Sequence, residues 1–249
     1  MGSSKGLAVQ SYCFRGFKAN EEVAAKVKAC GLSAVELCGV HADFAAPETF
    51  DRVIKTYRDA GVGIVSIGVQ GFKNEAAKEE KFFDFAKRAG ATTISANFPP
   101  DGAQEAMRTA ETLAREHGIR LAIHNHGGKH WLGSSQMLQA VFRQTGPQIG
   151  LMLDTAWALD SGEDPVAMVE KFGDRLYGLH LKDFVFDRAR KPQDVVVGTG
   201  NLDLPRLFAA LRKVSFAGLL ILEYEGDVAN PVPALRECVE SLKKELVNV

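Results

Sequence analysis

The sequence alternates eight times between a short run of apolar or β-branched residues and a longer amphipathic stretch. The short runs have the length of strands, whereas the stretches between them carry apolar residues at helical spacing. The eight expected strands cover residues 6–12, 34–38, 63–69, 91–98, 119–125, 148–154, 175–183 and 218–225. Eight strand-helix pairs in 249 residues are typical of a closed barrel, because open doubly wound sheets usually stop at about five or six strands. The sequence therefore predicts an α/β fold, the (β/α)8 TIM barrel.

The barrel is expected to form a single domain over residues 1–249. No linker-like change of composition divides the chain, and 46% hydrophobic residues are enough for one large core. The seventh strand is expected to lead into a long loop, and the last helix is expected over residues 232–247.

The charges of the chain are nearly balanced, with 30 Lys and Arg against 31 Asp and Glu. This balance predicts no broad attraction for nucleic acid or for an anionic membrane surface. The four cysteines form no CxxC pair, no apolar run approaches the roughly 18 residues of a membrane span, and the first residues do not resemble a secretory signal. We therefore expect a cytoplasmic protein with a small-molecule partner, and a homo-oligomer is compatible with the sequence.

Polar residues collect at the carboxyl ends of the expected strands, where the active sites of such barrels lie. These residues are Glu36, His124, His126, Asp154, His180, Lys182, Glu223 and Glu225. All but Glu36 belong to strands five to eight. Because His124 and His126 are two residues apart, both face the same side of a strand, and alternation alone does not choose between them. The same holds for the pairs on strands seven and eight.

Two histidines and two carboxylates from neighbouring strands can surround one divalent cation. Imidazole nitrogen and carboxylate oxygen both suit Mn, Fe, Co and Zn, whereas Mg is less favoured. Asp154 alone could instead cap a turn, and His180 alone could be a hydrogen-bonded core residue. Four such residues on consecutive strands favour a metal, because buried carboxylates without a partner are costly.

The other histidines have simpler interpretations. His41 is expected at the surface after strand two, and His117 at the end of a helix, where a cation favours the helix dipole. His130 lies in a glycine-rich loop that is expected to cover the mouth.

Five motifs in order, LAIHNHGG, GLMLDTAW, YGLHLKD, VGTGNLDL and GLLILEYEGD, resemble the xylose isomerase-like TIM barrel superfamily, in particular its sugar phosphate isomerase/epimerase group. The resemblance covers essentially the whole chain. It implies one metal ion held by an acidic residue on strand five, an Asp on strand six, a His on strand seven and a Glu on strand eight. At these places the chain has His124, Asp154, His180 and Glu223.

The chain departs from the family pattern at two positions. His124 stands where most relatives have Glu, and Trp157 stands where many have His. The family's epimerases are thought to use two metal-bound Glu residues as bases on opposite faces of the sugar. A metal-bound imidazole has no free lone pair to accept a proton, so His124 is a poor base. This departure argues against a symmetric two-Glu epimerase.

The resemblance implies a sugar isomerase or epimerase that acts through a metal-chelated enediolate on a ketose or keto-sugar. Glu223 is the preferred general base, and Lys182, His126 or a metal-bound water is the candidate proton donor. The expected substrate-binding residues are Glu36, Trp157, His130 and Glu225. No recognisable phosphate site is present near the mouth, which favours an unphosphorylated sugar or polyol-derived ketone.

Two alternatives stay open. The same chemistry could expel or add a group, which would make the protein a lyase, dehydratase or hydratase on a keto-sugar; the loss of one base suits elimination. The barrel could also bind a sugar without turnover. A DNA-repair endonuclease is disfavoured, because strands three and four lack the extra histidines that three zinc ions would need.

Overall fold

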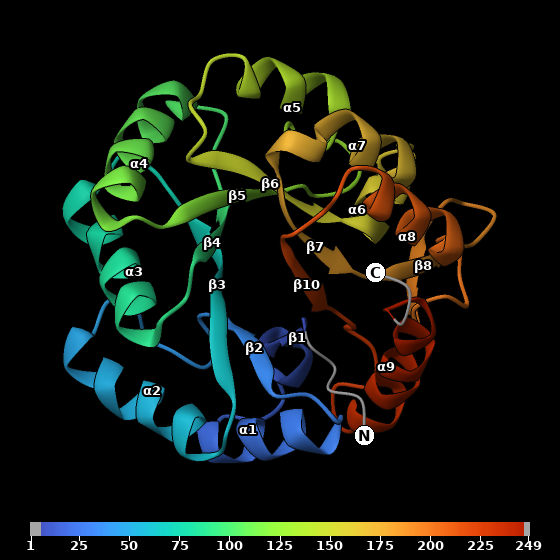
Figure 1. Cartoon of the computed structure of the whole chain (residues 1–249), viewed down its shortest axis with the longest axis horizontal. Helices are drawn as coiled ribbons and strands as arrows, with labels where there is room; N and C mark the ends of the chain where they lie inside the picture. Colours follow the sequence, from blue (N-terminus) through green and yellow to red (C-terminus); the bar gives the residue numbers. More distant parts are fainter. Residues whose placement is uncertain (1–5, 247–249) are drawn as a thin grey trace.

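The computed structural model describes residues 6–246, and these form a closed barrel of eight parallel strands inside a ring of helices (Figure 1). The barrel strands are β1 (Leu7–Gln10), β2 (Ala34–Leu37), β3 (Gly63–Gly71), β4 (Thr93–Asn97), β5 (Arg120–His124), β6 (Ile149–Asp154), β7 (Leu176–Leu181) and β10 (Leu219–Leu222). Their order around the barrel is β1-β10-β7-β6-β5-β4-β3-β2. The predicted single-domain TIM barrel is thereby confirmed.

The helices that follow the strands pack around the outside of the barrel. They are α1 (Asn20–Ala29), α2 (Phe50–Asp59), α3 (Ala76–Ala89), α4 (Ala103–His117), α5 (Ser135–Phe142), α6 (Thr155–Asp160), α7 (Pro165–Phe172), α8 (Leu204–Lys213) and α9 (Val232–Leu246), with 3-10 turns at Ser11–Phe14, Pro47–Thr49 and Gly173–Arg175. The last helix was predicted over residues 232–247, and Val247 lies outside the described residues. Both ends of the predicted domain lie outside them as well. Within residues 6–246, no helix has the length and apolar character that crossing a membrane requires.

The inside of the barrel changes from apolar to polar along the strands. A small apolar cluster inside it includes Ala8, Ala122, Met152 and Ile221. Since side chains return to the same face at every second residue, the residues two positions further along also face inward. These residues are Gln10, His124, Asp154 and Glu223, and all of them are buried. An apolar layer therefore supports a polar floor beneath the mouth.

The segment after β7 differs from the sequence-based expectation. The predicted seventh strand ends early, at Leu181, and the expected long loop contains an antiparallel hairpin of β8 (Asp183–Phe186) and β9 (Pro192–Val195). The buried carboxylate of Asp183 accepts backbone N–H groups of Gly198, Gly200 and Leu202, at 3.0, 2.8 and 2.9 Å. These bonds hold the returning chain against the start of the hairpin.

Replacing Asp183 with Ala should lower the free energy of unfolding by about 3 kcal/mol, because three backbone N–H groups lose their acceptor. Urea denaturation checks this. The matched control is Asp187→Ala at the exposed tip of the hairpin, where the carboxylate also accepts backbone N–H groups. Its loss should stay below about 1 kcal/mol, and equal losses in the two variants would contradict the anchoring role.

Candidate metal centre and active site

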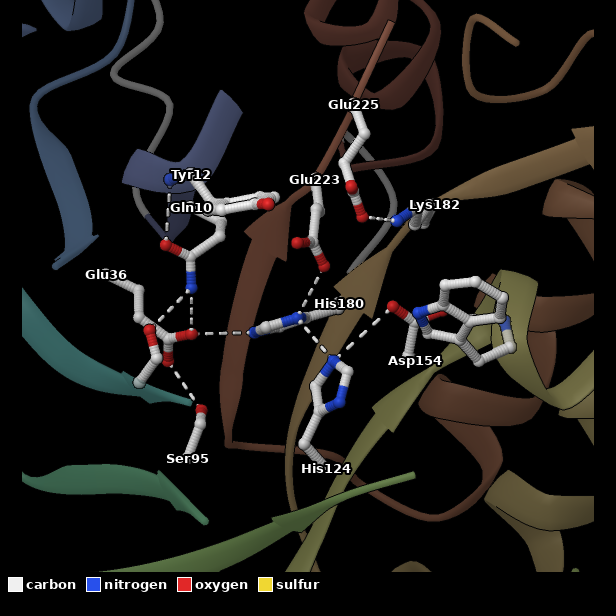
Figure 2. Close-up of polar contacts among 12 residues, drawn as sticks. Gln10, Tyr12, Glu36, Ser95, His124, Asp154, His180, Lys182, Glu223 and Glu225 are labelled. Atoms are coloured by element: carbon white, nitrogen blue, oxygen red, sulfur yellow. Dashed lines mark hydrogen bonds and ion pairs between the residues drawn. The ribbon is translucent and has the colours of Figure 1, made fainter. Parts of the chain in front are cut away.

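Four side chains that could ligate a metal ion converge on the floor of the mouth (Figure 2). They are His124, Asp154, His180 and Glu223, at the ends of β5, β6, β7 and β10, and we call them the metal cluster. All four are buried, and one ligand atom from each lies within 4.8 Å of the others. His180 Nδ1 is 2.8 Å from Glu223 Oε2 and 3.0 Å from His124 Nε2. The structure thus brings the sequence-predicted ligand set together at one point.

The metal cluster suits a divalent cation. Asp154 Oδ1 accepts the backbone N–H of Trp157 at 2.8 Å. The buried Oδ2 has no hydrogen-bond partner within residues 6–246 and lies 3.5 Å from His124 Nε2. A buried carboxylate oxygen without a partner is costly, and a cation here would remove that cost. Two imidazole nitrogens and two carboxylate oxygens match Zn, Mn, Fe or Co. These residues could therefore hold the ion that the sequence predicts.

The charges of the metal cluster depend strongly on one another. Burial alone lowers the pKa of an imidazole, but the carboxylates of Glu36 and Glu223 raise the pKa of His180 to about 10. Burial raises the pKa of a carboxyl group, yet Lys182 and His180 hold the pKa of Glu223 well below its usual range. Burial raises the pKa of Asp154 to about 6, and burial together with His180 lowers the pKa of His124 to about 3. With no ion bound, His180 is therefore the charged imidazole and His124 the neutral one.

Lys182 supplies a second buried positive charge beside the metal cluster. Its Nζ pairs with Glu225 Oε1 and lies 5.1 Å from the ring centre of Trp157. Burial lowers the pKa of a lysine, but Glu223, Asp154 and the hairpin residue Asp194 raise the pKa of Lys182 above its usual range. Lys182 is thus held as an ammonium ion behind the side chain of Glu225.

Three aromatic side chains extend from the metal cluster toward the glycine-rich loop. His126 Nδ1 lies 3.4 Å from His124 Nδ1, and the His126 ring stacks on Trp157 with a centroid distance of 6.4 Å. His130 lies 5.0 Å from His126, ring centre to ring centre. Burial and the neighbouring histidines lower the pKa of His126 to about 4, so it is neutral at pH 7.

Glu36 lies beneath the mouth, on β2, and is fully buried. Its carboxylate accepts hydrogen bonds from four side chains, one of which is His180. It is not among the residues that line the mouth. This geometry favours a role below the substrate over the predicted contact with sugar hydroxyls.

A cavity of about 460 Å³ opens above the metal cluster. It is lined by Gln10, Tyr12, Cys38, Gly39, Val40, Gly68, Val69, His124, His126, Trp157, Glu223 and Glu225. This volume is ordinary for a small-molecule site. Of the predicted substrate-binding residues, Trp157 and Glu225 line the cavity, whereas Glu36 and His130 do not.

Several features of the site lay beyond the sequence-based prediction. Gln10 and Tyr12 line the mouth from the first strand and the turn after it, and neither is a charged residue that would mark a site in the sequence. Asp194 reaches the site through the hairpin, and its Oδ1 accepts the backbone N–H of Glu225 at 3.3 Å. The expectation for His41 was wrong: it is buried, with one ring nitrogen 3.0 Å from the carbonyl oxygen of Phe17.

The sequence is similar to a known protein family and to several curated proteins. A family described as "Xylose isomerase-like TIM barrel" matches residues 24–245. Among curated proteins, the chain is 31% identical over 132 residues to the rhizopine catabolism protein MocC of Rhizobium meliloti, covering 47% of this chain and 40% of that protein. It is 25% identical over 201 residues to the inosose dehydratase of Geobacillus thermodenitrificans, covering 72% of this chain and 65% of the relative. The chain therefore spans less than two thirds of these relatives' lengths.

Solved structures with the same fold cover nearly the whole chain at low sequence identity. The probable 3-DHS dehydratase AsbF of Bacillus anthracis has a TM-score of 0.77 at 16% identity, over 96% of this chain and 98% of that one. The D-allulose 3-epimerase from Methylomonas sp. has a TM-score of 0.75 at 15% identity, over 96% and 97% of the two chains. The IOLI protein with a bound zinc atom has a TM-score of 0.78 at 12% identity, over 97% and 98%.

The affinity for a divalent ion should rise with pH. Because the pKa of His180 is about 10, an ion must displace the proton on Nδ1. Affinity should therefore increase about tenfold for each unit between about pH 7 and pH 9. Below about pH 6, protonation of Asp154 should steepen the dependence. Chelator competition with Zn²⁺ in non-coordinating buffers measures this, and an affinity that stays constant from about pH 7 to 9 would show that the ion displaces no proton.

Proposed function

Because the chain belongs to the xylose isomerase-like TIM barrel family, we propose that it is a divalent-metal-dependent dehydratase that acts on a small polyhydroxy ketone of the inosose type. Inosose dehydratases recur among the curated relatives, and a probable dehydratase shares the fold. The family also includes proteins with isomerase or epimerase activity, so the choice depends on the site of this chain.

The observation that carries the proposal is the asymmetry of the metal cluster. One side presents the carboxylate of Glu223, whereas the side of β5 presents the imidazoles of His124 and His126. An epimerase of the two-base type needs a proton acceptor on each face of the carbon. Elimination needs one base and one acid. In this proposal the carboxylate of Glu223 is the base and an imidazole on the side of β5 is the acid.

Glu223 is placed to take a proton from the substrate. A divalent cation in the metal cluster would polarise a substrate carbonyl and acidify the C–H bond beside it. Glu223 lines the cavity, and its Oε2 is bonded to His180 Nδ1, while no hydrogen bond to its Oε1 is found among the described residues. Since its pKa is held low, Glu223 is a carboxylate at neutral pH, with Oε1 ready to accept the proton.

His126 is placed to return a proton to the leaving group. When His124 directs Nε2 to the metal cluster, its Nδ1 carries the N–H and donates to Nδ1 of His126, 3.4 Å away. His126 then carries its own proton on Nε2. In the proposed reaction Glu223 accepts the C–H proton, and the electron pair of that bond forms the C=C bond as the C–O bond of the neighbouring hydroxyl breaks. The departing hydroxyl takes the His126 Nε2 proton and leaves as water, and the proton held by Glu223 returns to His126 through solvent in the cavity, which restores both groups.

The cavity favours an uncharged substrate with a flat apolar face. Trp157, Tyr12 and Val69 provide apolar surface beside the charged floor. Of the described residues, no Lys or Arg lines the cavity. Lys182 is engaged with Glu225, and Arg15 donates to the backbone carbonyl oxygens of Tyr12 and Glu225. An anionic phosphate or carboxylate on the substrate would meet the carboxylates of Glu223 and Glu225, with no lining Lys or Arg among the described residues to pair with it.

The isomerase that the sequence favoured is the second candidate. It is supported by Lys182 and Glu225, because the ammonium of Lys182 lies behind a carboxylate that lines the cavity and could pass a proton through it. Both activities begin with the same proton removal, and only the product separates them.

The His126→Asn variant should lower kcat for dehydration by about 100-fold while metal content stays the same, because the acid is lost and the ligands are kept. The assay follows metal-loaded protein with inosose and other neutral keto-sugars by NMR in D2O, where dehydration gives an unsaturated product. His117→Asn, on α4 outside the site, is the matched control and should keep full activity.

An epimer or aldose formed with solvent deuterium and without loss of water would contradict the dehydratase and favour the isomerase. Bound metal with no turnover of any neutral keto-sugar would contradict both and favour a binding barrel. An unchanged kcat in His126→Asn would remove His126 as the acid.

A further inference from the structure

The carboxylate of Glu36 has a complete set of hydrogen bonds inside the barrel (Figure 2). Oε1 accepts from Gln10 Nε2 at 2.5 Å and from His180 Nε2 at 2.9 Å. Oε2 accepts from the hydroxyl groups of Ser66 and Ser95 at 2.5 and 2.6 Å. With two donors on each oxygen and no solvent exposure, Glu36 has no lone pair free for a substrate hydroxyl.

The direction of these bonds is set by groups around them. The amide oxygen of Gln10 accepts the backbone N–H of Tyr12 at 3.1 Å, so its Nε2 is the group that faces Glu36. The same Nε2 lies 3.3 Å from the carbonyl oxygen of Gly68. Gln10, Ser66 and Ser95 come from β1, β3 and β4, so three neighbouring strands hold the carboxylate in place.

We propose that Glu36 is a positioning residue that fixes the tautomer and ring orientation of His180 for metal binding. Glu36 as a carboxylate can only accept, so the nitrogen that faces it, His180 Nε2, carries the N–H. The other nitrogen, Nδ1, faces the metal cluster, 2.8 Å from Glu223 Oε2 and 3.0 Å from His124 Nε2, and offers its lone pair once an ion displaces its proton. Among the described residues, His180 is the member of the metal cluster to which Glu36 is hydrogen-bonded.

A negatively charged acceptor at His180 Nε2 strengthens metal binding by the ring, which a neutral acceptor does not do to the same extent. A carboxylate bonded to the remote N–H of a ligating histidine makes the ring a stronger ligand as well as orienting it. Loss of such a partner typically costs about 10- to 100-fold in metal affinity. The proposal rests on the metal site of the proposed function and is independent of the reaction that follows.

The test measures Co²⁺ binding without substrate in the full chain, for the wild type and two variants. Glu36→Gln keeps a carbonyl acceptor for His180 but loses the charge, and its dissociation constant should rise about tenfold. Glu36→Met removes the acceptor, and the constant should rise about 100-fold with a shift of the Co²⁺ ligand-field bands. Ser66→Ala removes a donor to Glu36 and keeps the bond to His180, so its loss should be much smaller than in either Glu36 variant.

Thermal unfolding of the metal-free proteins separates positioning from stability. If Glu36 only stabilises the barrel, the variants will unfold at lower temperature while their dissociation constants and Co²⁺ spectra match the wild type, which would overturn the proposal. A wild type that binds no Co²⁺ would overturn the metal site and this proposal together. Turnover does not enter the test, so an error in the proposed reaction leaves the result unaffected.

A second measurement uses only the wild type, so it tests the proposal even if Glu36→Met does not fold. In the Zn²⁺-loaded wild type, ¹⁵N NMR of the histidine side chains should show His180 protonated at Nε2 and not at Nδ1. A proton on Nδ1 with a bare Nε2 would overturn the proposal.

Discussion

The burial of negative charge at the floor of the barrel is the constraint on which the rest of the site depends. Glu36, Asp154 and Glu223 all lie inside the barrel, where burial removes most or all of the water around their carboxylates. His180 lies between Glu36 and Glu223 and is bonded to both, which compensates part of this charge. In the part of the chain that the structure describes, one oxygen of Asp154 has no hydrogen-bond partner. Two imidazoles and two carboxylates gathered on this floor make it a good site for a divalent ion.

The floor is also asymmetric, and this asymmetry directs the chemistry that the site can support. On one side Glu223 is an ionised acceptor, held so by Lys182 and His180. On the other side His124 and His126 are neutral imidazoles, which offer a ligand and an N–H donor. A site with carboxylates on both sides would have two bases, whereas the proposed function gives this chain one base, Glu223, and one donor, His126.

The strand periodicity was enough to predict the barrel, because each apolar run needs its helix to cover it and eight such units close a sheet. The four members of the metal cluster were predicted from the resemblance to the family, because alternation along the strands did not choose between His124 and His126 or between Glu223 and Glu225. The surroundings of Glu36 were not predictable in this way. Ser66, Ser95 and Gln10 look like ordinary strand residues, and only the closed barrel brings them to one carboxylate. Asp194 was missed for a related reason, because its hairpin is held by the long-range bonds of Asp183.

The central claim is that one divalent ion binds to four specified atoms in the barrel floor. Anomalous diffraction from crystals of the protein grown with Zn²⁺ or Mn²⁺ tests it most directly. The account predicts one strong peak per chain, within coordination distance of His124 Nε2, Asp154 Oδ2, His180 Nδ1 and the Glu223 carboxylate. A peak held by other residues, or no peak in the mouth at saturating metal, would contradict the account.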